Sequence, residues 1–132
     1  DKVTPDMEPD QFTLDEANSL IPWLDEKFRK LNMLRQEYVV AQPRLGDIQL
    51  TSDKGIDDAG LRAVSEQLAW QIDQGVEEIL DQGIIVRDVS RGLVDFPSLR
   101  DNQDIYLCWI GGEEQIGYWH ETDRGFSHRQ PI

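Results

Sequence analysis

The stretch Ile105-Tyr106-Leu107-Cys108-Trp109-Ile110 is apolar at every position and rich in β-branched and aromatic side chains. A strand that is covered on both faces has a continuous apolar sequence, whereas a half-exposed strand alternates between apolar and polar residues. These six residues therefore predict a central β-strand that is covered on both sides.

Three shorter segments near this strand have the same β character, and turn residues separate each segment from the next. In chain order, the four segments are 84–89, 93–96, 105–110 and 116–120. The first two are expected to form a β-hairpin across the turn Ser90-Arg91-Gly92. Residues 84–132 thus predict a three- or four-stranded antiparallel β-meander, followed by an ordered irregular tail over residues 121–132.

Residues 12–83 show a helical period instead. Apolar residues recur at spacings of three, four and seven over residues 14–38 and again over residues 61–79, with charged residues on the other faces. The stretch 43–57 contains proline, glycine, serine and aspartate, which predicts a long connection. Two amphipathic helices joined in this way predict an antiparallel helical hairpin.

Local signals predict where these helices begin, bend and end. Thr13 followed by Glu16 is the pattern of a capping box and marks the start of the first helix. Pro22 removes one backbone donor, so we expect a kink or a break in the first helix at this point. Gly83 can adopt the left-handed conformation that ends helices, and it is expected to end the second helix.

The predicted fold class is therefore α+β. The helical hairpin of residues 12–83 is expected to pack on the small sheet of residues 84–132 in one compact domain. Residues 1–11 contain four acidic side chains and two prolines, and they predict a mobile acidic arm. The chain begins at Asp1 rather than at methionine, so the sequence leaves open whether a leader segment was removed.

Composition excludes several classes of function. The chain has 132 residues, of which 26 are acidic and 13 basic, giving a net charge of −13. Direct binding to nucleic acid or to an anionic membrane needs a basic surface, so we expect neither. No apolar run approaches the roughly 18 residues of a membrane span. The single cysteine, Cys108, excludes a disulfide within the chain. We expect a soluble, cytoplasmic protein.

Asp95, Cys108, His120 and His128 carry the oxygen, sulfur and nitrogen atoms that zinc or iron accepts. Their spacing matches no helix or loop ligand motif. Whether Cys108 and His120 share a sheet face depends on the strand register, which the sequence does not give. The favoured interpretation is a buried Cys108 and a hydrogen-bonded His120. No metal or cofactor is therefore predicted, and Asp95, Cys108 and His120 are the candidate ligands if a metal is present.

Two kinds of catalysis remain as alternatives. Cys108 beside His120, with Asp95 orienting the histidine, follows the logic of an activated nucleophile. A catalytic thiol needs exposure and a lowered pKa, however, and Cys108 lies in the most apolar run of the chain. General acid–base chemistry by Asp95, His120 and Glu121 is favoured over the nucleophile. The alternative function is thus a small metal-dependent or acid–base enzyme that uses Asp95 and His120.

Arginine and aromatic side chains concentrate in the last third of the chain. Guanidinium groups at Arg100 and Arg129, near His120, suit the binding of a small anion, although ion pairing with nearby carboxylates is favoured. Trp109 and Trp119 indicate core packing with a share in an interface. We therefore expect a non-enzymatic protein-interaction or small-ligand-binding module. Its predicted site residues are Asp95, Arg100, Trp109, Trp119, His120, Glu121 and Arg129.

The predicted helices and the surface charge leave the partners open. Two helices cannot enclose a core alone, so a homodimer that completes a four-helix bundle is an alternative to a monomer. The acidic surface has two interpretations: it keeps the protein soluble, or it binds a basic protein partner.

Several motifs in residues 12–132 are specific enough to indicate a family. They are Phe12-Thr13-Leu14-Asp15-Glu16-Ala17-Asn18 with Pro22, Gly92-Leu93-Val94-Asp95-Phe96-Pro97, Leu107-Cys108-Trp109, Tyr118-Trp119-His120-Glu121, Gly125-Phe126 and Arg129. Together they resemble an uncharacterised bacterial and archaeal family, domain of unknown function number two-two-zero-three. The family has no assigned activity, so the resemblance implies domain boundaries and no function.

Overall fold

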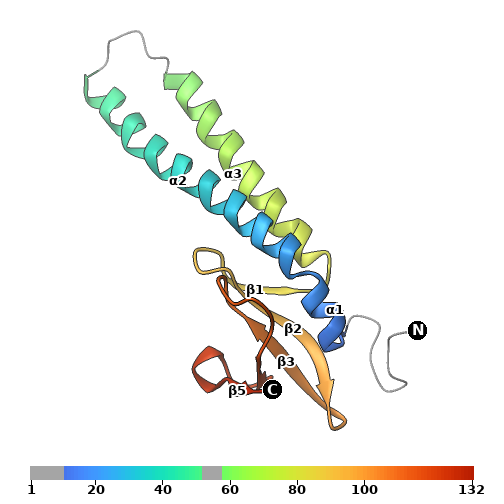
Figure 1. Ribbon diagram of the computed structural model, residues 1–132. Helices are drawn as coiled ribbons and strands as arrows, with labels where there is room; N and C mark the ends of the chain where they lie inside the picture. The colour runs from blue at the N-terminus through green and yellow to red at the C-terminus, as the bar shows by residue number, and fades with distance from the viewer. Residues whose placement is uncertain (1–10, 52–57) are drawn as a thin grey trace.

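The computed structural model describes residues 11–51 and 58–132. Helices pack on a five-stranded antiparallel sheet, which gives an α+β fold (Figure 1). The elements in chain order are α1 (Leu14–Ser19), α2 (Ile21–Thr51), α3 (Asp58–Leu80), β1 (Ile85–Asp88), β2 (Leu93–Arg100), β3 (Gln103–Trp109), β4 (Tyr118–Glu121), a 3-10 helix η1 (Phe126–His128) and β5 (Gln130–Pro131). The strands are ordered β1-β2-β3-β4-β5, so each strand pairs with its neighbours in sequence.

The fifth strand corrects the predicted count of three or four. It lies in the tail over residues 121–132, which the sequence predicts to be irregular, and Gln130 and Pro131 pair with Trp119 and Tyr118 of β4. Proline lacks the N–H that a central strand needs, but an edge strand tolerates it. Pro131 is accommodated because β5 lies at the edge of the sheet.

The predicted connection over residues 43–57 is wrong for residues 43–51, because α2 continues to Thr51. Pro43 and Gly46 each weaken a helix locally, but propensity over a few residues is a weak guide that the rest of the fold overrides. The remainder of that connection lies outside the described residues, as do residues 1–10 of the predicted acidic arm.

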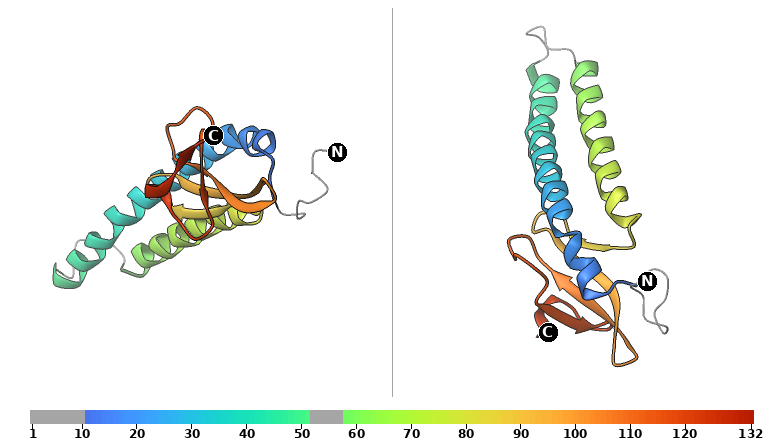
Figure 2. Two further views of the ribbon diagram at one scale, coloured as in Figure 1. Left: turned by 90° about the horizontal axis from the view of Figure 1, so that it is seen from below. Right: turned by 45° about the vertical axis from the view of Figure 1, so that its right-hand side comes forward.

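The N-terminal helical region is interrupted at Leu20, just before Pro22. α1 ends at Ser19 and α2 begins at Ile21, so Pro22 is the second residue of α2, where the missing N–H has no helical partner to lose. The kink at Pro22 itself stays a prediction. α2 and α3 lie side by side and run in opposite directions (Figures 1 and 2).

The predicted helix-end signals at Thr13 and Gly83 are confirmed. The Thr13 side chain accepts from the Glu16 backbone N–H, and the Glu16 side chain accepts from the Thr13 N–H, which completes the capping box. α3 ends at Leu80, and Gly83 has a φ of 90°, the left-handed conformation that other residues rarely adopt.

A two-residue turn joins β2 to β3. Asp101 and Asn102 both have positive φ, at 51° and 62°, which is the signature of a type I′ hairpin turn. The flanking residues Arg100 and Gln103 form the first cross-strand pair. Because the turn type fixes the pairing of a hairpin, this short turn sets the register of the two longest strands.

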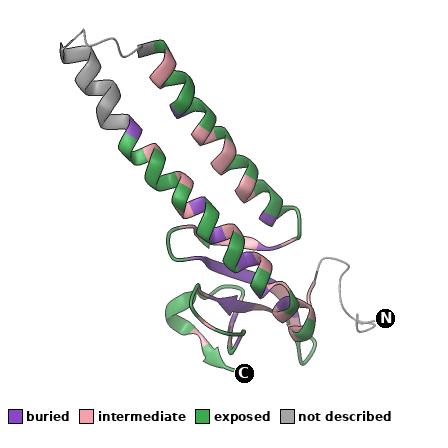
Figure 3. Ribbon diagram, turned by 45° about the horizontal axis from the view of Figure 1, so that its top comes forward, coloured by how far each residue is buried: buried purple, intermediate pink, exposed green. Residues whose placement is uncertain are grey.

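The sheet has one face against the helices, which we call the helix face. Phe96 of β2 pairs with Leu107 of β3, and both side chains are buried there. They pack with residues of the helices such as Leu24, Leu31 and Ile79. Figure 3 shows buried residues in the strands and on the parts of the helices nearest to them, while the rest of the helical surface is more exposed.

Among the described residues, no helix combines the length and the apolar character that crossing a membrane requires.

Phe96 provides a test of this core. Phe96→Ala removes a fully buried ring and is expected to lower the free energy of unfolding by about 3–5 kcal/mol. The exposed Val39 provides a control, because Val39→Ala should change stability by no more than about 0.5 kcal/mol. Urea unfolding of both variants measures the difference. Similar losses from the two substitutions would contradict the assigned core.

Candidate functional site

The strand register brings Asp95, Cys108 and His120 onto the sheet face opposite the helices. Asp95 of β2 pairs with Cys108 of β3, and His120 of β4 pairs with Tyr106, two residues from Cys108. Side chains alternate between the two faces of a strand, so all three project from the same face. Each has no more than 2% of its surface exposed. We call this side of the sheet the pocket face.

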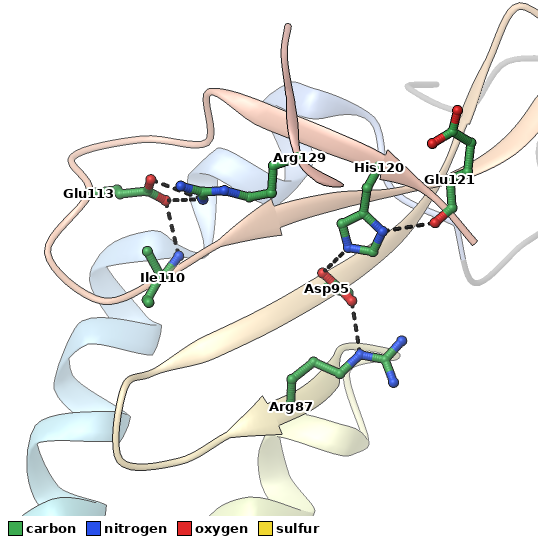
Figure 4. Close-up of polar contacts among 7 residues, drawn as sticks. All are labelled: Arg87, Asp95, Ile110, Glu113, His120, Glu121 and Arg129. Atoms are coloured by element: carbon green, nitrogen blue, oxygen red, sulfur yellow. Dashed lines mark hydrogen bonds and ion pairs between the residues drawn. The ribbon is translucent and has the colours of Figure 1, made fainter. Parts of the chain in front are cut away.

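Asp95 lies at the centre of the polar contacts on this face. Its Oδ1 lies 3.0 Å from Nε2 of His120, and its Oδ2 accepts a hydrogen bond of 2.9 Å from Nε of Arg87 (Figure 4). A buried carboxylate is costly unless charged or hydrogen-bonding groups compensate it. Arg87 and His120 provide that compensation, and the hydrogen bond to Asp95 raises the pKa of the Arg87 guanidinium.

His120 is held by both of its ring nitrogens. Nδ1 donates to the backbone carbonyl of Glu121 at 2.8 Å, because a carbonyl oxygen can only accept. Nε2 therefore faces the Asp95 carboxylate, and a proton shared between Nε2 and Oδ1 makes that contact a hydrogen bond. The Tyr106 ring packs edge-on against the imidazole, with the ring centres 5.6 Å apart. The imidazole is thus fixed in orientation, with Nε2 directed at the cluster.

Cys108 is a protonated thiol in this environment. Burial, followed by the negative charge of Asp95, raises the pKa of the Cys108 thiol to about 12, against a smaller lowering by Arg129. A nucleophilic cysteine requires a lowered pKa and access to solvent. The free thiol of Cys108 therefore does not fit the nucleophile alternative, in which His120 would activate it.

The three side chains have the geometry of a metal-ligand set. One ligand atom from each of Asp95, Cys108 and His120 lies within 4.8 Å of the other two. Around a tetrahedral zinc ion with ordinary bond lengths, ligand atoms lie about 3.3–3.7 Å apart. To reach these separations, the 3.0 Å contact between Asp95 and His120 would open by a few tenths of an ångström, and a pair at the 4.8 Å limit would close by about 1 Å.

A pocket of about 760 Å³ lies next to these residues, with Asp95 and Cys108 in its lining. Its outer wall is residues 122–128, which we call the wall segment, and His128 is part of it. The Phe126 ring of this segment contacts the guanidinium groups of Arg91 and Arg129, at 5.3 and 4.3 Å from the ring centre. The polar cluster is therefore buried from bulk water yet adjacent to a space of ligand size.

Comparison with known proteins identifies the family. The family model described as "Uncharacterized conserved protein (DUF2203)" matches residues 11–132. The chain belongs to the DUF2203 family. This confirms the resemblance carried by the sequence motifs. Searches of curated proteins and of solved structures found no match.

In this DUF2203 chain, the side chains of four other predicted site residues, Arg100, Trp109, Trp119 and Glu121, lie outside the cluster. Trp109 is fully buried on the helix face and donates from Nε1 to the Glu113 carbonyl at 3.0 Å. Trp119 is also on the helix face, where the Arg100 guanidinium lies 4.8 Å from its ring centre. The Glu121 side chain accepts from Gln130, and only its carbonyl reaches His120.

Arg129 lies at the border of the DUF2203 site. Its guanidinium forms an ion pair of 3.0 Å with Glu113 (Figure 4). It also lies over the Tyr118 ring, 4.0 Å from the ring centre. Arg100 and Arg129 therefore do not converge on His120 to bind a small anion, as one interpretation of the sequence suggested. Both have partners within the fold.

The sequence pattern does not predict two features of the DUF2203 site. Arg87 is the partner of Asp95, but β1 has an irregularity between Val86 and Asp88, so simple alternation could not place its side chain. The wall segment has no regular sequence pattern, and only the apolar Phe126 signalled that it packs against the domain.

The buried Cys108 gives a pH-dependent stability. Its thiol stays protonated in the folded state up to a pH of about 12, whereas in the unfolded chain it ionises near its ordinary pKa of 9.0. The unfolded state binds fewer protons between these values, so stability falls as the pH rises through this window. Urea unfolding at pH of about 8 and about 10.5 should show an extra loss of the order of 1–2 kcal/mol in the native protein relative to Cys108→Ala. Equal losses in both proteins would contradict the buried, protonated thiol.

Proposed function

We propose that this DUF2203 domain binds one transition-metal ion of the zinc class at Asp95, Cys108 and His120. The adjoining pocket then serves as a site for a small ligand at that metal. The observation that carries the proposal is the convergence of three ligand atoms within 4.8 Å of one another on a rigid sheet. Three neighbouring strands supply one ligand each, so the backbone ladder preorganises the set.

The donor types favour zinc, iron(II) or cobalt(II). Thiolate and imidazole ligands select these metals over magnesium and calcium, which prefer oxygen alone. A site with three protein ligands leaves a fourth position for water or another small molecule. Such a metal polarises bound oxygen atoms and lowers the pKa of bound water, which is the chemistry that metal-dependent hydrolytic sites use.

The contacts around the cluster also suit a metal. A ligating histidine almost always donates its second ring N–H to a carbonyl or carboxylate, as His120 does to Glu121. The second oxygen of Asp95 is held by Arg87, which leaves Oδ1 directed at the cluster. A metal cation would take the place of the proton between His120 and Asp95 and would displace the thiol proton of Cys108.

A metal-free interpretation competes with this one. The direct hydrogen bond between His120 and Asp95 is a complete pairing in its own right and supports a purely structural role for both residues. In that case the domain remains the interaction or ligand-binding module expected from its composition, with no metal in the pocket. The two interpretations differ in whether the protein binds a metal at all.

Cobalt titration distinguishes the two interpretations. The native protein, freed of any bound metal by a chelator that is then removed, should bind one Co²⁺ per chain and develop the ultraviolet charge-transfer absorption of a cobalt–thiolate bond. Cys108→Ala keeps a small buried side chain but removes the sulfur. It should abolish this absorption and weaken cobalt binding by more than about 100-fold. Losing a group that only hydrogen-bonds to a metal ligand already weakens metal binding by up to about 100-fold, and Cys108 would bind the metal directly.

Ser98→Ala is the matched control, because Ser98 is also buried in the sheet but lies on the helix face. This variant should bind cobalt as the native protein does. Circular dichroism confirms that each variant is folded. A folded native protein that develops no cobalt–thiolate absorption, or a Cys108→Ala variant that binds cobalt unchanged, would refute the metal site.

A further inference from the structure

The lining of the pocket beside the cluster holds two arginines and two aspartates, so it is balanced in charge within a strongly acidic chain. The chain carries a net charge of −13, yet two arginines, Arg87 and Arg124, and one histidine, His128, line this pocket. The acidic residues in the lining are Asp95 and Asp123. Asp95 is already paired with Arg87 and His120, so it offers little negative charge to a ligand.

Arg124 is available for a ligand. Among the described residues, its guanidinium has no hydrogen-bond or ion-pair partner, and its backbone N–H alone bonds to the Glu121 carbonyl. Arg87 donates to Asp95 through Nε, and Figure 4 shows its two terminal nitrogens directed away from that carboxylate. Guanidinium groups bind carboxylate and phosphate oxygens through paired N–H donors.

The wall segment holds these groups in place. Within it, the His128 N–H bonds to the Gly125 carbonyl at 2.9 Å, and the next residue bonds back to Phe126 at 3.2 Å. The guanidinium groups of Arg91 and Arg129 both contact the Phe126 ring and connect the segment to the rest of the domain. Thr122 and Ser127 add hydroxyl groups to the same lining. A preorganised wall lowers the entropic cost of binding.

We propose that this pocket binds a small molecule through a carboxylate or phosphate group. One oxygen of that group occupies the open metal position, and Arg124 and Arg87 hold the others. The proposal rests on the proposed metal site, because the metal supplies the charge that an oxyanion would bind directly. The volume of about 760 Å³ is that of a site for a small organic molecule.

Anion titrations of the cobalt-loaded protein test this proposal. Inorganic phosphate and acetate are added separately to the full chain, with sodium chloride at equal ionic strength as the reference. At least one of the two anions should change the visible cobalt spectrum in a saturable way, where chloride does not. The anion that binds more tightly identifies the ligand group as phosphate or carboxylate.

Arg124→Gln should weaken the binding of that anion by about tenfold, which corresponds to the loss of one charge-assisted hydrogen bond. Arg100→Gln is the control, because Arg100 is an exposed arginine that lies over the Trp119 ring, outside the pocket. It should leave anion binding unchanged.

The outcomes separate the two proposals. A protein that binds no cobalt refutes the metal site and this inference with it. A protein that binds cobalt but whose spectrum responds to neither phosphate nor acetate refutes the anion proposal alone. Equal anion binding by Arg124→Gln and the native protein also overturns it.

Discussion

The register between β2, β3 and β4 is the constraint on which both the core and the site depend. Because side chains alternate along a strand, a shift of one residue would move Phe96 out of the core and turn Asp95 toward the helices. The turn at Asp101-Asn102 fixes the pairing of β2 with β3 at one end. The apolar helix face favours the same register, since a one-residue shift would turn its large side chains away from the helices.

Once the register is set, the pocket face has to accommodate a buried carboxylate. The negative charge of Asp95 in β2 is compensated by Arg87 from β1 and by His120 from β4. Cys108 lies in β3, between the strands of Asp95 and His120, so the cluster is built from four neighbouring strands. The same arrangement brings an oxygen, a nitrogen and a sulfur atom within 4.8 Å of one another. Stability and the proposed metal site are therefore two consequences of one arrangement.

The sequence predicts much of the fold and only part of the site. Periodicity and the Thr13 capping box identify the fold class, because helical and strand periods differ strongly. The apolar run at residues 105–110 locates the central strand correctly. The helix through Pro43 is not predicted, because local turn chemistry is a weak guide within a long helix.

The residue types identify Asp95, Cys108 and His120 as candidate ligands, but their convergence depends on the strand register, which residue types alone do not encode. Trp109 and Trp119 are direct neighbours of Cys108 and His120 in their strands, and because side chains alternate along a strand they lie on the opposite face, the helix face.

Anomalous X-ray diffraction tests the central claim most directly. Crystals of the chain, purified without chelator and soaked in zinc, would be measured on both sides of the zinc absorption edge. The account predicts an anomalous peak about 2.0–2.3 Å from an oxygen of Asp95, Sγ of Cys108 and Nε2 of His120. His120 Nδ1 should still donate to the Glu121 carbonyl. The account would be contradicted by a map with no anomalous peak among the three residues, in which Asp95 Oδ1 and His120 Nε2 keep their hydrogen-bond distance of 3.0 Å.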